Sequence, residues 1–282
     1  MITDEETNKI YLADCLPKWH PKFFERFEKV LKECNIQFDF LPGTKDIWAV
    51  DYMPIQVSTD KFIRFKYAPD YLQPKKYHKY ISDSETIFKE IGIEAKHSNL
   101  IVDGGNVVRS RDKVIMCDKV SCENKNVPER ELIGTLEELF EVDKIVFVPW
   151  DRNDKIGHVD GMVRFIDNDT VLINDLSIED EDYQRSFRMS LHNARLDWVE
   201  LPYNPPVDPN SASAKGIYIN YLRMEQAIIM PTFGNKYDKK AMRVLEEVFT
   251  EKAIKNIESN EIAEGGGVLN CISWNIKAEQ VL

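Results

Sequence analysis

Candidate functional residues recur at nearly regular intervals along this chain of 282 residues. Asp51, Asp103, Asp160, Tyr221 and Cys271 follow one another at intervals of 50 to 61 positions. The same order of expected elements recurs with them: a short strand, a second strand, a helix and a third strand. A repeat of this length is typical of architectures in which each unit is one supersecondary motif. We therefore expect about five units, each of which presents the end of its first strand to a common centre.

Hydrophobic periodicity and turn residues predict the elements of these units. The expected helices are 21–34, 84–91 (with its N-cap at Ser82 or Ser84), 128–140, 180–194 and 238–249. The expected strands are 10–13, 38–41, 53–57, 107–108, 114–116, 144–149, 162–166, 170–174, 196–201, 217–221 and 227–231. The segment 202–213 is rich in Pro, Asn and Ser and is expected to be an elaborate loop rather than a domain boundary. We therefore expect a single α/β domain over residues 1–282.

Composition limits the classes of partner. The formal net charge of -11 argues against a nucleic-acid surface, for which a basic patch is the expected footprint. It is compatible with a small cationic substrate, although acidity also serves simply to keep proteins soluble. The N-terminus lacks the pattern of a signal peptide, and no apolar run approaches the roughly 20 residues that span a bilayer. We expect no membrane partner and a cytoplasmic location, and a homo-oligomer remains open.

The cysteines are odd in number and lack metal-ligand spacing. The chain has five of them, and Cys117 and Cys122 are too far apart for a CxxC pair. Such a pattern favours reduced thiols in a cytosol-like compartment. We therefore expect no metal site and no disulfide framework.

Cys271 follows the glycine run Gly265-Gly266-Gly267 after three further residues. Three glycines give the backbone unusual freedom and permit close approach to a ligand. A cysteine placed there is a candidate nucleophile if a base or a lowered pKa activates its thiol. The plain structural alternative is a buried cysteine that follows a flexible turn.

Two residues of the segment 157–165 are candidate partners for this thiol. His158 and Asp160 are two positions apart, so on a strand they face the same side. A histidine can transfer a proton near neutral pH, and the carboxylate can bind a cation beside it. The alternative is an exposed histidine and aspartate in a loop.

Two further segments carry aspartates beside turns. Asp103 opens the sequence Asp-Gly-Gly-Asn, which is typical of a tight turn that enters a hairpin. Trp48 and Asp51 precede Pro54 and combine a flat aromatic face with a negative charge. Both features suit a planar cation, through cation–π contact and paired hydrogen bonds. The alternative is a core tryptophan and a turn aspartate.

Together, and in this order, these motifs resemble those of the agmatine deiminase and bacterial-type peptidylarginine deiminase family. That family belongs to the guanidino-group-modifying superfamily, and the resemblance runs from about Trp48 to Ser273. It includes the stretch Tyr-Ile-Asn-Tyr at 218–221 and the segment 228–234. The resemblance implies a five-bladed α/β propeller of ββαβ units with pseudo-fivefold symmetry, the pentein fold.

The resemblance also implies roles for the candidate residues. Cys271 corresponds to the nucleophile and His158 to the general acid and base. Asp51 and Asp160 correspond to the carboxylates that bind the guanidinium. Asp103 either orients His158 or contacts the guanidinium, and Trp48 corresponds to an aromatic residue near the pocket. No metal or organic cofactor is implied.

The implied activity is hydrolytic deimination of a small guanidinium substrate through a covalent thiouronium on the cysteine. Agmatine is the favoured substrate, and its products would be N-carbamoylputrescine and ammonia. Two positions depart from the agmatine-specific pattern: Val50 stands where an arginine usually precedes Asp51, and Asn270 stands where a histidine usually precedes Cys271. The alternatives are an arginine or peptidylarginine deiminase, an amidinotransferase, a methylarginine hydrolase, or a non-catalytic binder of arginine-like ligands.

Overall fold

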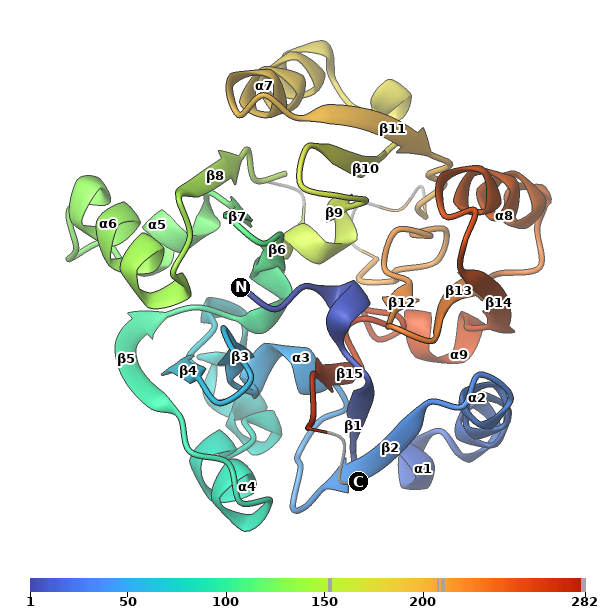
Figure 1. Ribbon diagram of the computed structural model, residues 1–282, viewed down its shortest axis with the longest axis horizontal. Helices are drawn as coiled ribbons and strands as arrows, with labels where there is room; N and C mark the ends of the chain where they lie inside the picture. The colour runs from blue at the N-terminus through green and yellow to red at the C-terminus, as the bar shows by residue number, and fades with distance from the viewer. Residues whose placement is uncertain (152–153, 207, 209–210, 280–282) are drawn as a thin grey trace.

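In the part of the chain that the structure describes, five three-stranded sheets are arranged around a central axis like the blades of a propeller (Figure 1). The computed structural model describes residues 1–151, 154–206, 208 and 211–279. In each sheet the first two strands pair antiparallel, and the third strand pairs parallel with the second. A helical crossover joins the second and third strands, because a parallel pair cannot be joined by a tight hairpin. The ββαβ order expected from the sequence is therefore confirmed.

Two blades follow the N-terminal region of the chain. The blade at the lower left of Figure 1 consists of β3 (Ile55–Gln56), β4 (Phe62–Lys66), α4 (Ser84–Glu90) and β5 (Lys96–Ile101). The next blade consists of β6 (Val108–Arg109), β7 (Lys113–Cys117), α5 (Lys119–Glu123), α6 (Glu129–Phe140) and β8 (Lys144–Val148). Short elements connect and precede their strands, namely α3 (Ala49–Tyr52), η2 (Asp70–Leu72), η3 (Lys75–Tyr80) and η4 (Gly104–Asn106).

Two further blades occupy the top and the right of Figure 1. The first consists of β9 (Val163–Phe165), β10 (Thr170–Asn174), α7 (Glu181–Asn193) and β11 (Asp197–Leu201), with the short helices η5 (Val159–Gly161) and η6 (Leu176–Ile178). The second consists of β12 (Leu222–Arg223), β13 (Ala227–Thr232), α8 (Lys236–Val248) and β14 (Ala253–Glu258), followed by α9 (Asn260–Ala263).

The fifth blade joins the two ends of the chain. Strand β15 (Ser273–Ile276) pairs antiparallel with β1 (Lys9–Ala13), which pairs parallel with β2 (Gln37–Leu41) after α1 (Leu16–Trp19) and α2 (Pro21–Glu33). The pairing aligns Tyr11 with Trp274, whose rings lie 5.3 Å apart. The ring of blades is therefore closed by strands that are about 260 residues apart in the sequence, and Cys271 lies just before the closing strand.

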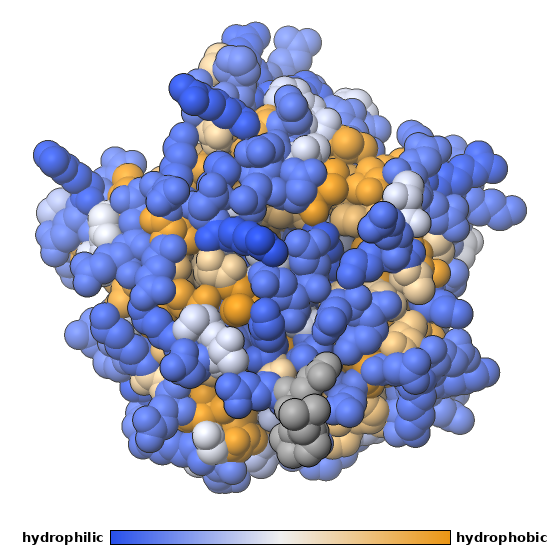
Figure 2. Space-filling model, in the orientation of Figure 1, coloured by the Kyte–Doolittle hydropathy of each residue, from blue (hydrophilic) through white to orange (hydrophobic). Residues whose placement is uncertain are grey.

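The outer helices are amphipathic, and their apolar residues face the sheets. In α2 the side chains of Phe23, Phe27 and Leu31 recur every fourth residue and are buried. In α8 the buried residues are Ala241 and Leu245, and a capping box of Asn235 and Asp238 begins the helix. Apolar residues are visible between the blades in Figure 2, while hydrophilic residues cover most of this face.

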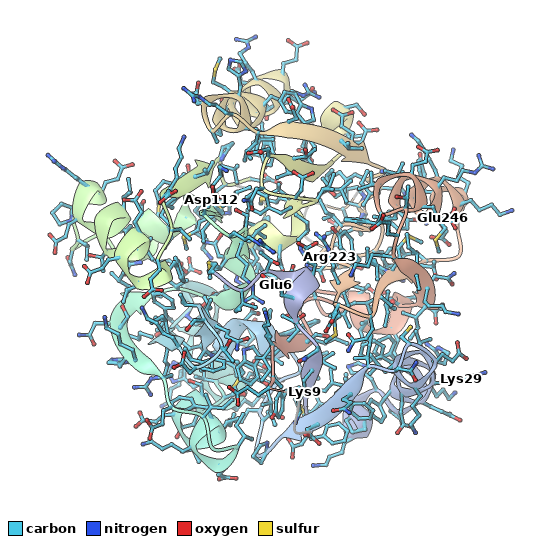
Figure 3. The ribbon with its side chains drawn as sticks, viewed as in Figure 1. Glu6, Lys9, Lys29, Asp112, Arg223 and Glu246 are labelled. Atoms are coloured by element: carbon cyan, nitrogen blue, oxygen red, sulfur yellow. The ribbon has the colours of Figure 1, made fainter. Side chains whose placement is uncertain are left out.

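An acidic N-terminal turn, η1 (Asp4–Glu6), lies at the centre of the ring (Figure 1). The carboxylate of Asp4 accepts a hydrogen bond from Arg164, and that of Glu5 accepts one from Arg223. Arg223 and Glu6 are labelled near the middle of Figure 3, whereas Lys29 and Glu246 lie on the outer helices. The ion pairs compensate the charges of arginines that are buried on the inner strands β9 and β12.

Most expected elements agree with the structure to within a few residues, but two predictions are wrong. The segment 217–221 was expected to be a strand, but the strand paired with β13 is β12. Tyr218 and Ile219 lie in a turn, and the burial of these two residues and of Tyr221 explains the hydrophobic run that resembles a strand. The N-cap of α4 is Asp83 rather than Ser82 or Ser84. Of the expected loop 202–213, residues 207 and 209–210 lie outside the described residues.

Within the described part of the chain, no helix combines the length and the hydropathy that crossing a membrane requires.

Candidate active site

The five blades bring their candidate residues together just before each inner strand. Each of these side chains is at most 8% exposed. The residues, in chain order, are Asp51, Asp103, His158, Asp160, Asn220 and Cys271. The repeat predicted from the sequence therefore produces a single cluster near the axis of the ring.

His158 lies between two carboxylates. Its Nε2 is 3.1 Å from Oδ2 of Asp103, and its Nδ1 is 3.3 Å from Oδ1 of Asp51. Burial of the imidazole lowers its pKa, but the negative charges of Asp51 and Asp103 outweigh that effect. The pKa of His158 is raised to about 10. The ring is therefore an imidazolium at neutral pH.

The turn that follows Asp103 needs both of its glycines. A Cβ on Gly104 would lie 1.9 Å from the carbonyl oxygen of Val50, and one on Gly105 would lie 2.6 Å from Nδ1 of His158. The backbone N–H of Gly105 donates to Oδ1 of Asp51 over 3.1 Å. The Asp-Gly-Gly pattern thus reflects close packing of the turn against the two neighbouring candidate segments.

Asp103 contacts His158 rather than only facing a substrate. Its Oδ2 accepts a hydrogen bond from the hydroxyl of Tyr71 over 3.2 Å as well as contacting Nε2 of His158. Tyr71 also lies edge-on to the imidazole, with the ring centroids 6.1 Å apart. This geometry favours the orienting role among the two roles that the sequence left open for Asp103.

Cys271 is buried against an amide and a carboxylate. Its sulfur lies 3.2 Å from Nδ2 of Asn220 and 3.6 Å from Oδ2 of Asp160. Burial, with the negative charges of Asp160 and Asp51, raises the pKa of the Cys271 thiol well above its ordinary value of 9.0. In the absence of a cationic ligand, the sulfur is therefore protonated at neutral pH.

Asn220 links the nucleophile candidate to the glycine loop. Its Oδ1 accepts backbone hydrogen bonds from Val268, Asn270 and Cys271, all between 3.2 and 3.3 Å. Its Nδ2 donates to Asp160 over 3.1 Å. The sequence pointed to Tyr221 at this place in the repeat, but the Tyr221 side chain is fully buried away from the cluster, 4.9 Å from the Arg164 guanidinium.

Asp160 and Asp51 differ in their surroundings. Asp160 accepts hydrogen bonds from the side-chain amides of Asn220 and Asn270, the latter over 2.7 Å. Asn270, the departure noted in the sequence, thus contacts the candidate carboxylate directly. Burial raises the pKa of Asp51 to about 7, although attraction to His158 opposes the shift. A cation that reaches both carboxylates is favoured because it offsets their repulsion.

The glycine run packs against Trp48. A Cβ on Gly265 would lie 2.8 Å from the indole ring, and one on Gly267 would lie 2.7 Å from the ring and 2.9 Å from the sulfur of Cys271. Gly266 adopts φ +102°, which favours glycine. Trp48 is not among the described residues that line the cavity beside Cys271, so its contact with substrate stays a prediction.

A cavity of about 310 Å³ opens beside the cluster. His158, Asp160, Asn220 and Cys271 line it, together with Gly266 and Gly267. Elsewhere its described lining includes one lysine, Lys155, and four more carboxylates, those of Asp151, Asp154, Glu179 and Asp208. Tyr183 and Tyr203 add aromatic surface near Glu179. The cavity therefore suits a small, cationic and partly apolar ligand.

Solved structures with the same fold carry related names. The chain superposes on C. jejuni agmatine deiminase with a TM-score of 0.80 and 18% identity, covering 97% of this chain and 94% of the other. The agmatine deiminase of Enterococcus faecalis gives a TM-score of 0.78 and 15% identity, with 99% and 95% covered. DDAH from Pseudomonas aeruginosa gives 0.60 and 12%, with 96% and 99% covered. These similarities confirm the α/β propeller, or pentein, fold.

Sequence comparison gives further relatives that are named agmatine deiminase, at low identity. The agmatine deiminase of Stutzerimonas stutzeri is 25% identical, over 70% of this chain and 64% of the relative. That of Ectopseudomonas mendocina is 22% identical, over 72% and 66%. The chain covers 54 to 66% of the length of the curated relatives that it matches.

A family-level comparison covers most of the chain. Residues 19–276 match the family described as Porphyromonas-type peptidyl-arginine deiminase. The match includes every residue of the cluster, from Asp51 to Cys271. This chain therefore belongs to the Porphyromonas-type peptidyl-arginine deiminase family.

Proposed function

We propose that this chain hydrolyses a guanidinium group to a ureido group and ammonia, with agmatine as the favoured substrate. The observation that carries the proposal is the position of the Cys271 thiol. It lies 3.6 Å from Asp160 and lines the same cavity as the imidazole of His158, which pairs with Asp51. A nucleophile, a proton donor and two carboxylates are the groups that deimination requires.

The reaction begins with capture of the cation. Asp51 and Asp160 bind the planar guanidinium through charged hydrogen bonds, which are roughly twice as strong as neutral ones. The positive charge of the bound substrate offsets the two carboxylates that raise the pKa of the Cys271 thiol, so the thiol loses its proton to solvent. Binding of the substrate thus produces the nucleophile.

The thiolate then attacks the central guanidinium carbon, and a carbon–sulfur bond forms. His158, an imidazolium at neutral pH, gives its proton to one nitrogen, and the carbon–nitrogen bond breaks with release of ammonia. The remaining thiouronium is covalent. Neutral His158 takes a proton from water, whose hydroxide adds to the same carbon. The carbon–sulfur bond then breaks to release the thiolate, and the hydroxyl proton passes to solvent as the ureido product forms.

The charge of the cavity favours agmatine over free arginine. Both molecules carry a guanidinium, but agmatine ends in an ammonium, whereas arginine also carries a carboxylate. Beyond the cluster, the described lining has one lysine among four carboxylates. Glu179 is half-buried, and burial together with the charge of Asp151 raises its pKa, so a second cation is favoured there. The names of the relatives and solved structures support the same substrate.

A panel of guanidinium compounds tests the proposal. Ammonia and the ureido product are measured with agmatine, free arginine, a peptide arginine and a methylated arginine. We expect kcat/KM for agmatine to exceed that for arginine by at least about tenfold, a difference set by charge complementarity. Amine exchange or methylamine release would indicate an amidinotransferase or a methylarginine hydrolase. Binding without product from any compound would overturn the proposal in favour of a ligand-binding protein.

A Glu179→Gln variant separates the two parts of the proposal. It keeps the shape of the side chain and removes the charge. We expect the preference for agmatine over arginine to fall about threefold to tenfold, while the turnover number for agmatine changes little. An unchanged preference would remove Glu179 from the argument for agmatine but would leave the deimination chemistry intact.

A further inference from the structure

Lys119 is a buried lysine that the proposed chemistry does not use. It is 2% exposed and lies at the start of α5, directly after β7. Its ammonium donates to Oδ1 of Asp70 over 2.9 Å and to the carbonyl oxygens of Lys155 and Ile156 over 3.2 and 2.7 Å. Three hydrogen bonds use the full donor capacity of a lysine.

The ammonium of Lys119 donates hydrogen bonds to the backbone just before His158. The carbonyls of Lys155 and Ile156 come three and two residues, respectively, before His158. Gly157 lies against the lysine stem, with φ +68°, and a Cβ there would lie 2.8 Å from Cδ of Lys119. The start of the His158 segment is therefore fixed by the ammonium and by the methylene groups.

The ammonium of Lys119 also contacts the turn that contains Tyr71, the residue that donates a hydrogen bond to Asp103. The ammonium lies 5.1 Å from the ring centroid of Tyr71, within cation–π range, and pairs with the adjacent Asp70. Tyr71 donates to the same oxygen of Asp103 that contacts His158, and its ring lies edge-on to the imidazole. A single buried charge thus contacts both supports of the imidazole, which lie on different blades.

We propose that Lys119 is a positioning residue for the reaction: its ammonium joins the Asp70–Tyr71 turn to the His158 segment and holds the imidazole where it can protonate the leaving ammonia. The proposal rests on the proposed function for its kinetic readout. Neither Lys119 nor Tyr71 is among the described residues that line the cavity. The effect of Lys119 on the imidazole is therefore indirect, through Tyr71 and the 155–157 backbone; the ammonium also pairs with the buried Glu123 over 3.7 Å.

The first test is Lys119→Met, which keeps most of the stem and removes the ammonium. Small displacements of a reacting group cost up to about 100-fold in rate, so we expect kcat for agmatine to fall about 10- to 100-fold. We expect KM to change less than about threefold, because the hydrogen bonds to Asp51 and Asp160 come from Gly105, Asn220 and Asn270 rather than from Lys119. Lys119→Arg is expected to recover part of kcat. The guanidinium restores the positive charge but cannot donate three hydrogen bonds from a single nitrogen.

The matched control is Lys113→Met, which removes a lysine six positions earlier on β7. The ammonium of Lys113 pairs with Asp112 and with Asp169. We expect its kcat to equal that of the wild type. A folded Lys119→Met protein with unchanged kcat, or with a raised KM alone, would overturn the proposal.

A double-mutant cycle tests whether Lys119 acts through Tyr71. Tyr71→Phe removes the hydrogen bond to Asp103 and keeps the ring. Residues that act as one unit have non-additive effects, so Lys119→Met should lower kcat less in the Tyr71→Phe background than in the wild type. Equal factors in both backgrounds would contradict the link. If Lys119→Met does not fold, Asp70→Asn tests the same link, because the Asp70 side chain is 58% exposed.

An NMR measurement distinguishes failure of this proposal from failure of the proposed function. If the wild type releases no ammonia from any guanidinium compound, the chemistry is wrong, but the position of His158 can still be read. The chain has five histidines. We expect Lys119→Met to shift the imidazole resonances of His158 and to leave the other four unchanged. Unchanged His158 resonances in a folded variant would overturn the positioning role.

Discussion

The side-chain amide of Asn220 donates to the sulfur of Cys271 over 3.2 Å, while its oxygen accepts three backbone N–H groups of the loop that carries this cysteine. A donor at the sulfur stabilises a thiolate more than a thiol. The same nitrogen contacts Asp160, so one amide aligns the nucleophile with a carboxylate that binds the substrate. Asn220 is therefore as much a part of the site as the residues that the motifs identified.

An Asn220→Asp substitution tests this role. The variant keeps the size of the side chain but replaces the donor with an oxygen that faces Asp160 and the sulfur. The added negative charge should raise the pKa of the thiol further, and we expect kcat/KM to fall at least about 100-fold. The loss should shrink as pH rises, which a pH profile would reveal. Activity near that of the wild type at neutral pH would contradict the role.

The glycine run provides a second test through Gly267→Ala. The new methyl group would lie 2.7 Å from Trp48 and 2.9 Å from the Cys271 sulfur, so one of them must move. We expect kcat/KM to fall about tenfold or more, because the nucleophile is displaced. Gly134→Ala is the matched control: it lies in α6 with nothing within 4 Å of the added Cβ. It should keep full activity and gain up to about 1 kcal/mol of stability.

The protonation of His158 is a third test. Its pKa is raised from 6.5 to about 10 because Asp51 and Asp103 stabilise the charged ring more than burial penalises it. The imidazole resonances of His158 should therefore titrate near pH 10 in the free protein. Titration between pH 6 and 7 would contradict the pairing with the two carboxylates.

The same shift predicts how stability depends on pH. The folded state holds the His158 proton more tightly than the unfolded state, so its contribution to stability is complete below pH 6.5. That contribution is lost as pH rises from 6.5 through about 10. Chemical denaturation across this range should show a falling free energy of unfolding. Tyr71→Phe keeps both carboxylates that face His158, so the pH dependence of its free energy of unfolding serves as the comparison.

The reactivity of Cys271 provides a fourth test. Its thiol is protonated in the free protein, and a bound cation should favour the thiolate. A haloacetamidine, which carries a positive charge, should label Cys271 at least about tenfold faster than the neutral haloacetamide at the same pH. Asp160→Asn should reduce this ratio. Equal rates with both reagents would contradict activation by the substrate charge.

The recurrence of strand and helix patterns predicted the ββαβ order, but it missed strands β4, β5, β14 and β15, of which β4 is mostly buried in the middle of its sheet. Strands β5 and β14 lie at blade edges, and most of the side chains in each are exposed or half-buried. Such strands lack the apolar alternation on which a prediction depends. Strand β15 is wholly buried, but its partner β1 lies at the other end of the chain, where local patterns carry no information.

The site was predicted where a motif marks it and missed where packing alone creates it. Cys271, His158 and Asp160 stand in short motifs with glycines, and the structure brings them together. Asn220 stands in the Tyr-Ile-Asn-Tyr stretch without a glycine motif, and the spacing of the repeat indicates the aromatic Tyr221 beside it, whose side chain belongs to the core. A buried lysine such as Lys119 cannot be distinguished in sequence from the surface lysines around it.

The proposal that Cys271 is the nucleophile is tested most directly by comparing the wild type with Cys271→Ser, each with agmatine as the substrate. Ammonia and the ureido product are measured together, and the reaction is quenched with acid so that the peptide that contains residue 271 can be examined by mass spectrometry. We expect equal amounts of the two products, an amidino adduct on Cys271, and loss of at least about 10⁴-fold in turnover for Cys271→Ser. Turnover by Cys271→Ser at a rate near that of the wild type would contradict the assignment of Cys271 as the nucleophile.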